Sequence, residues 1–332
     1  MKAARIAQPR VTVTVEDLDV REPGAGEVLL RMEACGVCHS DLFVTGLEKL
    51  SVTPLTLGHE GIGRVEAVGP GVDGWKSGDR AGITFLGTTC GVCDFCRAGE
   101  RRYCPKQTNF GHTLQGALAE YATAPAGALV CIPNGADAAA LAPMCCAGWT
   151  SAAAVREAAI APGQSVALFG YGGLGHLALQ LARHAGARVA VADACESKLE
   201  MARAAGADAA FAAETAGRAL LKEWGGVDAA IVLTGSPAAI PQAFKSLKRL
   251  GTLVLVGLSV SQYELPLVDT VLKGARIRGS YLGTREDLER VFAMTSDGRL
   301  RAHVETHTID DTVAVLERLR RGEVAGRAVV RF

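Results

Sequence analysis

The sequence predicts an α/β protein in which a doubly wound parallel sheet is joined to a mostly β domain. From about residue 163, apolar strand-like runs alternate with helical patterns, whereas the first 130 residues are rich in valine, glycine and turn signals. Four cysteines fall between residues 90 and 104 and predict a metal-binding lobe in the β domain. At 332 residues the chain is too long for one ordinary hydrophobic core, which favours two domains.

The first domain is expected to span residues 1–148. Three stretches in it alternate or run apolar as short strands do: EVLLRMEAC (27–35), GIGRVEAVG (61–69) and LAEYATAPA (118–126). After about residue 284 the alternation of strands and helices stops, and residues 285–332 carry one amphipathic helical pattern and a last short strand. We expect this C-terminal segment to return and complete the first domain.

The second domain, expected over residues 149–284, contains six strand-like runs separated by helical patterns. The runs are SVALFG (165–170), RVAVAD (188–193), DAAFAA (208–213), DAAIVLTG (228–235), TLVLVGL (252–258) and ARIRGSYLG (275–283). Strands that alternate with helices in this way predict a parallel, doubly wound sheet.

Composition argues against nucleic acid or a membrane as partner. The chain has 35 basic and 35 acidic residues, so it carries no electrostatic footprint for a polyanion. The uncharged run 138–155 is alanine-rich and contains Pro143 and Gly148, which favours a buried helical stretch over a membrane span. The N-terminus lacks the apolar stretch of a signal peptide. Ten cysteines in an apparently unexported chain favour metal binding over disulfides, so we expect a cytoplasmic protein.

The cysteine-rich lobe, at about residues 88–106, has the spacing C-x2-C-x2-C-x7-C. Its cysteines are Cys90, Cys93, Cys96 and Cys104. Four thiolates this close together suit a tetrahedral zinc ion and leave no coordination position open for substrate. The lobe is therefore expected to hold a structural zinc; an iron–sulfur centre or a redox dithiol is the alternative.

A glycine-rich loop follows the first strand of the second domain. Gly170, Gly172 and Gly175 form the pattern G-x-G-x-x-G, with Gly173 and Leu174 inside it, and a helix with one apolar face begins there. The glycines allow the backbone to approach a pyrophosphate, and the helix N-terminus supplies N–H donors. This context predicts a Rossmann domain; the alternative is a tight turn without a ligand.

An acidic residue ends the next strand. Asp193 lies eighteen residues beyond Gly175, where an acid is expected to bind the adenosine ribose hydroxyls. Its carboxylate would repel the 2′-phosphate of NADP, and the surrounding stretch ADACESK (192–198) contains no arginine, so NAD is the expected cofactor. Lys198 is placed either beside that ribose or on a solvated helix face.

Three further segments carry potential metal ligands. CGVCHSD contains Cys35, Cys38 and His39; LGHEGIG contains His59 and Glu60; APMCCAGWT contains Cys145 and Cys146. A catalytic zinc needs three protein ligands and an open fourth position. These segments are dispersed over more than a hundred residues, so spacing alone does not bring them together.

A resemblance does bring them together. GVCHSD (36–41), GHEGIG (58–63), the four-cysteine lobe, APMCCAGWT (142–150), the glycine loop and GRAVVRF (326–332) occur in one chain in this order. The chain resembles, essentially end to end, the zinc-dependent alcohol dehydrogenases of the medium-chain dehydrogenase/reductase superfamily, especially the shorter bacterial and yeast type. The resemblance implies a GroES-like catalytic domain, NAD, two zinc ions per chain and a homotetramer.

The resemblance also implies roles for individual residues. Cys38, His59 and Cys146 would be the ligands of the catalytic zinc, since the family pattern places the ligand cysteine directly before Ala-Gly. Asp41 would orient His59, and Glu60 would lie behind the zinc. His39 and Arg327 match positions that meet the cofactor pyrophosphate. The resemblance gives Cys35 no role beyond packing in the core. Cys131, Cys145 and Cys195 are expected to be small buried hydrophobic residues.

The implied reaction is the oxidation of a primary alcohol to an aldehyde, and its reverse, by hydride transfer from an alcohol held at zinc to nicotinamide. Ser40 would take the proton and pass it to the nicotinamide ribose. Relatives commonly have a histidine three residues later, but this chain has Phe43. Phe85 stands where short-type relatives often have tryptophan, which suggests a roomier apolar pocket. The alternatives are a zinc-dependent secondary-alcohol or polyol dehydrogenase and, in a different class, a zinc-ribbon binding module without catalysis.

Overall fold

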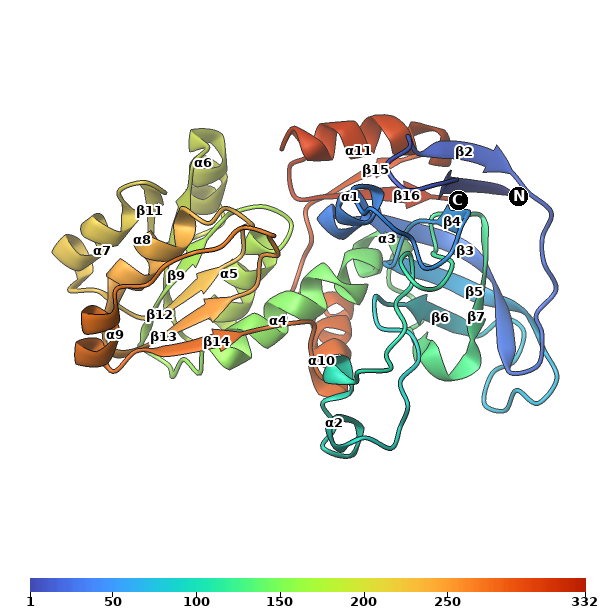
Figure 1. Ribbon diagram of the computed structural model, residues 1–332, viewed down its shortest axis with the longest axis horizontal. Helices are drawn as coiled ribbons and strands as arrows, with labels where there is room; N and C mark the ends of the chain where they lie inside the picture. The colour runs from blue at the N-terminus through green and yellow to red at the C-terminus, as the bar shows by residue number, and fades with distance from the viewer. The chain divides into compact units, whose positions relative to one another are not determined.

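The computed structural model describes residues 1–332, which fold into two compact units (Figure 1). The first unit comprises residues 1–146 and 288–332, and the second comprises residues 147–287. Both chain termini belong to the first unit. The predicted combination of a mostly β unit with a doubly wound α/β unit is confirmed.

The second unit is built on a six-stranded parallel sheet in the order β11-β10-β9-β12-β13-β14. The strands are β9 (Ser165–Phe169), β10 (Arg188–Asp193), β11 (Ala209–Ala212), β12 (Val227–Val232), β13 (Leu247–Leu255) and β14 (Arg276–Gly279). Each of the six predicted runs forms one of them. Numbered along the chain the order is 3-2-1-4-5-6, and it reverses between β9 and β12. In such sheets a dinucleotide binds outside the carboxyl ends of the strands at that reversal.

Helices connect the strands of this unit. They are α4 (Ala147–Glu157), α5 (Gly175–His184), α6 (Glu196–Ala204), α7 (Ala216–Trp224), α8 (Ala239–Ser246) and α9 (Leu267–Lys273), and α10 (Arg285–Ser296) begins in this unit. All five residues of β9 are buried, as expected for the central strand of a sheet covered on both faces.

An ion pair joins the amino ends of three strands in this sheet. The Asp228 carboxylate accepts hydrogen bonds from the backbone N–H and the hydroxyl of Ser165, both at 2.8 Å, and Lys248 Nζ lies 2.9 Å from it. Burial opposes ionisation of Asp228, but these hydrogen bonds and the lysine charge outweigh it and lower the pKa of the carboxyl group.

The first unit contains a seven-stranded sheet and a smaller three-stranded one. The larger sheet has the order β15-β16-β3-β5-β6-β8, with β7 also paired to β3, and the smaller has the order β2-β1-β4. The strands are β1 (Lys2–Ile6), β2 (Thr14–Asp17), β3 (Glu27–Val37), β4 (Leu55–Thr56), β5 (Gly61–Val68), β6 (Arg80–Ile83), β7 (Tyr121–Pro125), β8 (Val130–Cys131), β15 (Val304–His307) and β16 (Arg327–Arg331). Leu30, Ile62, Ile83 and Phe110 are among its fully buried side chains.

The last strand of the chain lies inside the larger sheet. β16 runs antiparallel to β3, with Val330 opposite Cys35, and parallel to β15. The C-terminal segment thus completes the sheet of the first unit, and it adds α11 (Thr312–Arg320) after the single turn η4 (Ile309–Asp311). The remaining short helices of this unit are α1 (His39–Thr45), α2 (Asp94–Arg97), η1 (Arg101–Tyr103), η2 (Ala126–Ala128), α3 (Ala138–Leu141) and η3 (Ala142–Cys145).

The alanine-rich run 138–155 is divided into α3, η3 and part of α4, and nearly all of its residues are buried. This confirms the predicted buried helical stretch. No single helix of the chain is long and apolar enough to cross a membrane. Only the bent pair formed by Ala138–Cys145 and Ala147–Glu157 reaches that length and composition.

Candidate active site

Four potential metal ligands meet at the ends of two neighbouring strands of the larger sheet. The donor atoms of Cys38, His59, Glu60 and Cys146 all lie within 4.8 Å of one another. Cys38 directly follows β3, and His59 and Glu60 directly precede β5. Because β3 and β5 are antiparallel neighbours, the end of one strand lies beside the start of the other. Cys146 directly follows η3 and completes the group from 86 or more residues further along the chain.

The Asp41 carboxylate fixes the geometry of this group. Its Oδ2 accepts the backbone N–H of Cys38 at 2.8 Å, and its Oδ1 accepts the backbone N–H of Gly58 at 3.1 Å and lies 3.2 Å from His59 Nδ1. Asp41 and His59 are each 1% exposed. With Nδ1 held by Asp41, the imidazole presents Nε2 to the cluster, and this buried atom has no hydrogen-bond partner.

The titratable groups of the cluster shift one another's pKa values. Burial opposes protonation of His59, but the carboxylate of Asp41 and the nearby Cys38 outweigh it and hold the pKa of His59 well above its usual value. A hydrogen bond from Cys146 lowers the pKa of Cys38 well below its usual value, and the same contact raises the pKa of Cys146. Two sulfur atoms and one unpartnered imidazole nitrogen fit a zinc site with an open fourth position.

Glu60 brings a carboxylate oxygen into the same group of donor atoms and is fully buried. Its Oε1 accepts a hydrogen bond from Arg327 of β16, while its Oε2 has no partner. Burial raises the pKa of Glu60 to about 7, against the lowering effect of the Arg327 charge. A Cβ atom on Gly36 would lie 1.9 Å from Glu60 Oε2, so only glycine leaves room for this carboxylate. The sequence carries no local signal for either contact, because Gly36 has no side chain and Arg327 is 267 residues away.

The other residues expected around the cluster lie on α1, on β16 or just after β6. His39 is exposed and is the first residue of α1, and Ser40 follows it half-buried. Phe43, on the same helix, is 49% exposed. Arg327 is bound to Glu60, so its expected contact with a pyrophosphate stays a prediction. Phe85 contacts the His59 ring edge-on, with ring centroids 5.1 Å apart.

The second cysteine cluster is local in sequence. The sulfur atoms of Cys90, Cys93, Cys96 and Cys104 all lie within 4.8 Å of one another, and none forms a disulfide. Cys104 Sγ is 3.6 Å and Cys96 Sγ is 4.0 Å from Cys90 Sγ. Backbone N–H groups of Val92 and Cys93 lower the pKa of Cys90 to about 6. Four converging sulfur atoms fit a closed tetrahedral metal site.

The glycine loop of the second unit has the steric properties that a dinucleotide requires. Gly170 follows β9 with φ +102°, a region that only glycine adopts readily. A Cβ atom on Gly175 would lie 2.2 Å from the Gly170 carbonyl oxygen, whereas a Cβ atom on Gly172 would meet nothing within 4 Å. Gly173 and Leu174 complete the turn, and α5 begins at Gly175. The loop is therefore closed against the protein at Gly175 and open toward a ligand at Gly172.

Asp193 ends β10 beside this loop. Its Oδ2 accepts the backbone N–H of Tyr171 at 2.7 Å, and its Oδ1 accepts that of Cys195 at 3.0 Å. These bonds fix the carboxylate at the carboxyl end of the sheet, where a ribose would bind. Lys198 lies half-buried on α6.

The expectation for the remaining cysteines is half wrong. Cys35 and Cys145 are buried, but Cys131 and Cys195 are exposed. Cys131 lies on the two-residue edge strand β8, and Cys195 precedes the first turn of α6, so neither side chain reaches a core.

Comparison with known proteins finds matches along the whole chain. A model of the alcohol dehydrogenase GroES-like domain matches residues 24–134, and a model of the zinc-binding dehydrogenase family matches residues 173–297. An alcohol dehydrogenase of Geobacillus stearothermophilus is 39% identical over 100% of this chain and 99% of its own. The structure is similar to an alcohol dehydrogenase of Aeropyrum pernix, with 33% identity, a TM-score of 0.92 and all of both chains covered. It is also similar to acetophenone reductase of Geotrichum candidum, solved in complex with NAD, with 31% identity, a TM-score of 0.89 and 100% and 97% of the two chains covered.

Proposed function

The chain belongs to the zinc-type alcohol dehydrogenases of the medium-chain dehydrogenase/reductase superfamily, and from that premise we propose that it oxidises primary alcohols to aldehydes with NAD, and catalyses the reverse reaction. The observation that carries the proposal is the buried, unpartnered Nε2 of His59 beside the thiols of Cys38 and Cys146. A buried polar atom without a partner is costly unless a ligand satisfies it.

Cys38, His59 and Cys146 would hold a catalytic zinc ion, which when bound supplies Lewis acidity toward an alcohol or carbonyl oxygen. Asp41 keeps the imidazole in one tautomer and one orientation. Glu60 brings a carboxylate oxygen into the same group of donor atoms and is itself held by Arg327. The Ser40 hydroxyl, two residues beyond Cys38 on α1, would accept the proton of the alcohol.

The glycine loop and Asp193 would hold NAD, which when bound supplies the hydride acceptor. The loop is open at Gly172, and Asp193 is fixed by two backbone N–H groups at the end of β10. The complex of acetophenone reductase with NAD supports this choice of cofactor. The lobe of four cysteines would hold a second, structural zinc, giving two zinc ions per chain.

A secondary alcohol is the second candidate substrate, because a relative of 31% identity is an acetophenone reductase and that name refers to a ketone. A polyol is less favoured, because polyol-type relatives often use a carboxylate as the third ligand and this chain has Cys146. A zinc-ribbon binding module without catalysis does not account for the donor set of Cys38, His59 and Cys146.

We place the enzyme in the cytoplasm as a homotetramer. All ten cysteines are free, as expected in a reducing compartment. The edge strand β14 has four exposed residues, and α9 beside it exposes large apolar side chains: Leu267, Val268, Val271 and Leu272. An unpaired edge with an apolar border favours pairing with a second copy of the chain. Light scattering that found a monomer or a dimer would contradict the homotetramer.

The function is tested by a coupled absorbance screen of the purified enzyme with NAD over primary, secondary, aromatic and polyol substrates. Medium-chain or aromatic primary alcohols should give the highest kcat/KM. Phe85 replaces a tryptophan that short-type relatives often have, and the segment after Phe43 lacks their common aromatic-proline signature, so we expect a roomier apolar pocket. Ethanol as the best substrate would overturn the expected pocket, and a secondary alcohol as the best would favour the second candidate.

Cofactor preference should depend on Asp193. The wild type should prefer NAD over NADP, and Asp193→Ser should narrow the ratio of the two kcat/KM values about tenfold or more, since like charges in contact cost several kcal/mol. The kcat/KM values for both cofactors at one alcohol concentration measure this. Equal use of both cofactors by the wild type would refute the role of Asp193.

Mutations in the two cysteine-containing clusters should have different effects. Cys146→Ala should abolish turnover and lower the zinc content from about two ions per chain to about one, while the melting temperature changes little. Cys96→Ala should lower the melting temperature or dissociate the assembly, because a structural zinc contributes folding free energy. Metal analysis, calorimetry and light scattering measure these effects. A Cys96→Ala variant that lost only turnover would reverse the two assignments.

Phe43 should limit the release of the proton. Its side chain can neither accept nor donate a proton, so the proton held near Ser40 must leave directly to solvent. Phe43→His should therefore raise kcat/KM for alcohol oxidation more at pH 7 than at pH 9, by at most ~10-fold. Imidazole buffer should rescue the wild type in part and the variant little. An unchanged pH profile without buffer rescue would show that the proton leaves by another route.

A further inference from the structure

The segment of residues 280–284 follows β14 at the carboxyl edge of the parallel sheet. Asp193, at the carboxyl end of β10, marks the half of the sheet where the adenosine of a dinucleotide binds. The other half of the dinucleotide must then lie over the carboxyl ends of β12, β13 and β14, on the opposite side of the reversal in strand order. The segment 280–284 belongs to that half.

This segment has an unfavourable local conformation. Leu282 adopts φ +49°, which costs about 1 kcal/mol or more for a residue with a side chain. A Cβ atom on Gly283 would lie 2.4 Å from the Trp149 ring. The hydroxyl oxygen of Ser280 is buried and has no hydrogen-bond partner. Such a conformation persists only where neighbouring groups fix it, and such conformations cluster at functional sites.

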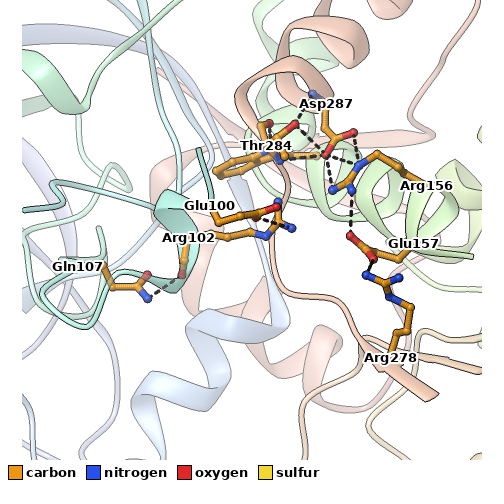
Figure 2. Close-up of polar contacts among 9 residues, drawn as sticks. Glu100, Arg102, Gln107, Arg156, Glu157, Arg278, Thr284 and Asp287 are labelled. Carbon is orange, nitrogen blue, oxygen red and sulfur yellow. Dashed lines mark hydrogen bonds and ion pairs between the residues drawn. The ribbon is translucent and has the colours of Figure 1, made fainter. Parts of the chain in front are cut away.

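Hydrogen bonds from two helices fix the segment at its C-terminal end (Figure 2). Trp149 of α4 donates its Nε1–H to the Thr284 carbonyl oxygen at 2.6 Å. Asp287, in the first turn of α10, accepts the backbone N–H of Thr284 at 2.9 Å and its hydroxyl at 3.2 Å. Arg156 of α4 donates to both oxygens of the Asp287 carboxylate at 3.1 to 3.2 Å.

The same ion pairs reach the strand that precedes the segment. Arg156 Nη1 donates to Glu157 at 2.9 Å, and the second carboxylate oxygen of Glu157 lies 2.7 Å from Arg278 of β14 (Figure 2). Glu157 and Asp287 are buried, at 9% and 5% exposed. Two arginines and two carboxylates thus connect both ends of the segment to α4. The two carboxylates are buried, whereas the side chains of Arg156 and Arg278 are 40% and 57% exposed. A buried carboxylate needs hydrogen-bond partners, and here these partners fix the geometry of the segment.

We propose that Trp149, Arg156 and Asp287 are positioning residues that hold the segment 280–284 in the conformation that receives the nicotinamide half of NAD. The unpartnered Ser280 hydroxyl would be satisfied by a polar group of that half. The inference rests on the proposed function, since it assumes that NAD binds to this sheet.

The test compares the complete cofactor with ADP-ribose, which lacks nicotinamide. In the zinc-loaded enzyme, Asp287→Asn keeps the shape of the side chain and removes its charge, and Trp149→Phe keeps an aromatic ring and removes the N–H donor. Each variant should lower kcat/KM for NAD about tenfold or more, because small misplacements of reacting groups cost up to about a hundredfold. The inhibition constant of ADP-ribose should stay within about twofold of the wild-type value, because the adenosine half of the site is unchanged.

Asp228→Asn is the matched control, because it breaks an ion pair of the same sheet at the amino ends of the strands. It should lower the melting temperature without changing either cofactor parameter. If the Asp287 and Trp149 variants weakened the use of NAD and the binding of ADP-ribose equally, these residues would support the whole cofactor site and the proposal would be overturned. Unchanged values of both kcat/KM for NAD and the inhibition constant of ADP-ribose would also overturn it. If Asp287→Asn does not fold, Trp149→Phe decides by the same criteria. A wild type that neither binds ADP-ribose nor reduces NAD would instead refute the proposed function.

Discussion

One buried carboxylate determines the geometry of the metal-binding group. Asp41 accepts backbone N–H groups from two of the three segments that carry potential ligands, at Cys38 and Gly58, and it holds the imidazole of His59. Gly58 can adopt its φ of +95° and lie close to the Leu118 backbone only because it lacks a Cβ atom. The ends of β3 and β5 are thereby joined by a side chain as well as by the sheet. Without Asp41 three buried donors would lose their acceptor together.

The features that the sequence predicted best are those specified by neighbouring residues. The six strands of the parallel sheet, the glycine loop and the four-cysteine lobe each rest on local periodicity or spacing. The meeting of Cys38 with Cys146 rests on the pairing of β3 and β5 and on the path of η3, and only the family resemblance suggested it. The contacts between Glu60 and Arg327 and between Trp149 and Thr284 span 267 and 135 residues, and no local pattern predicts them.

Both functional halves of the molecule rely on the absence of a side chain. A Cβ atom on Gly36 would lie 1.9 Å from the carboxylate of Glu60, and a Cβ atom on Gly283 would lie 2.4 Å from the ring of Trp149, so neither position has room for a side chain. Neither glycine is marked by a positive φ, so neither is explained by backbone conformation. Their role is close packing, which a sequence reveals only when the neighbour across the gap is known. No sequence motif therefore marks either glycine for this role.

The position of β16 has a consequence for the synthesis of the protein. The last strand of the chain pairs with β3, which leads into Cys38, and it carries the arginine that holds Glu60. The second unit is one continuous stretch of chain, whereas the first is interrupted by it. Since a nascent chain emerges from its N-terminus and domains fold as units, the nucleotide-binding unit can be complete while the sheet around the metal ligands still lacks a strand. The surroundings of Cys38 and Glu60 can therefore be finished only after β16 has joined the sheet.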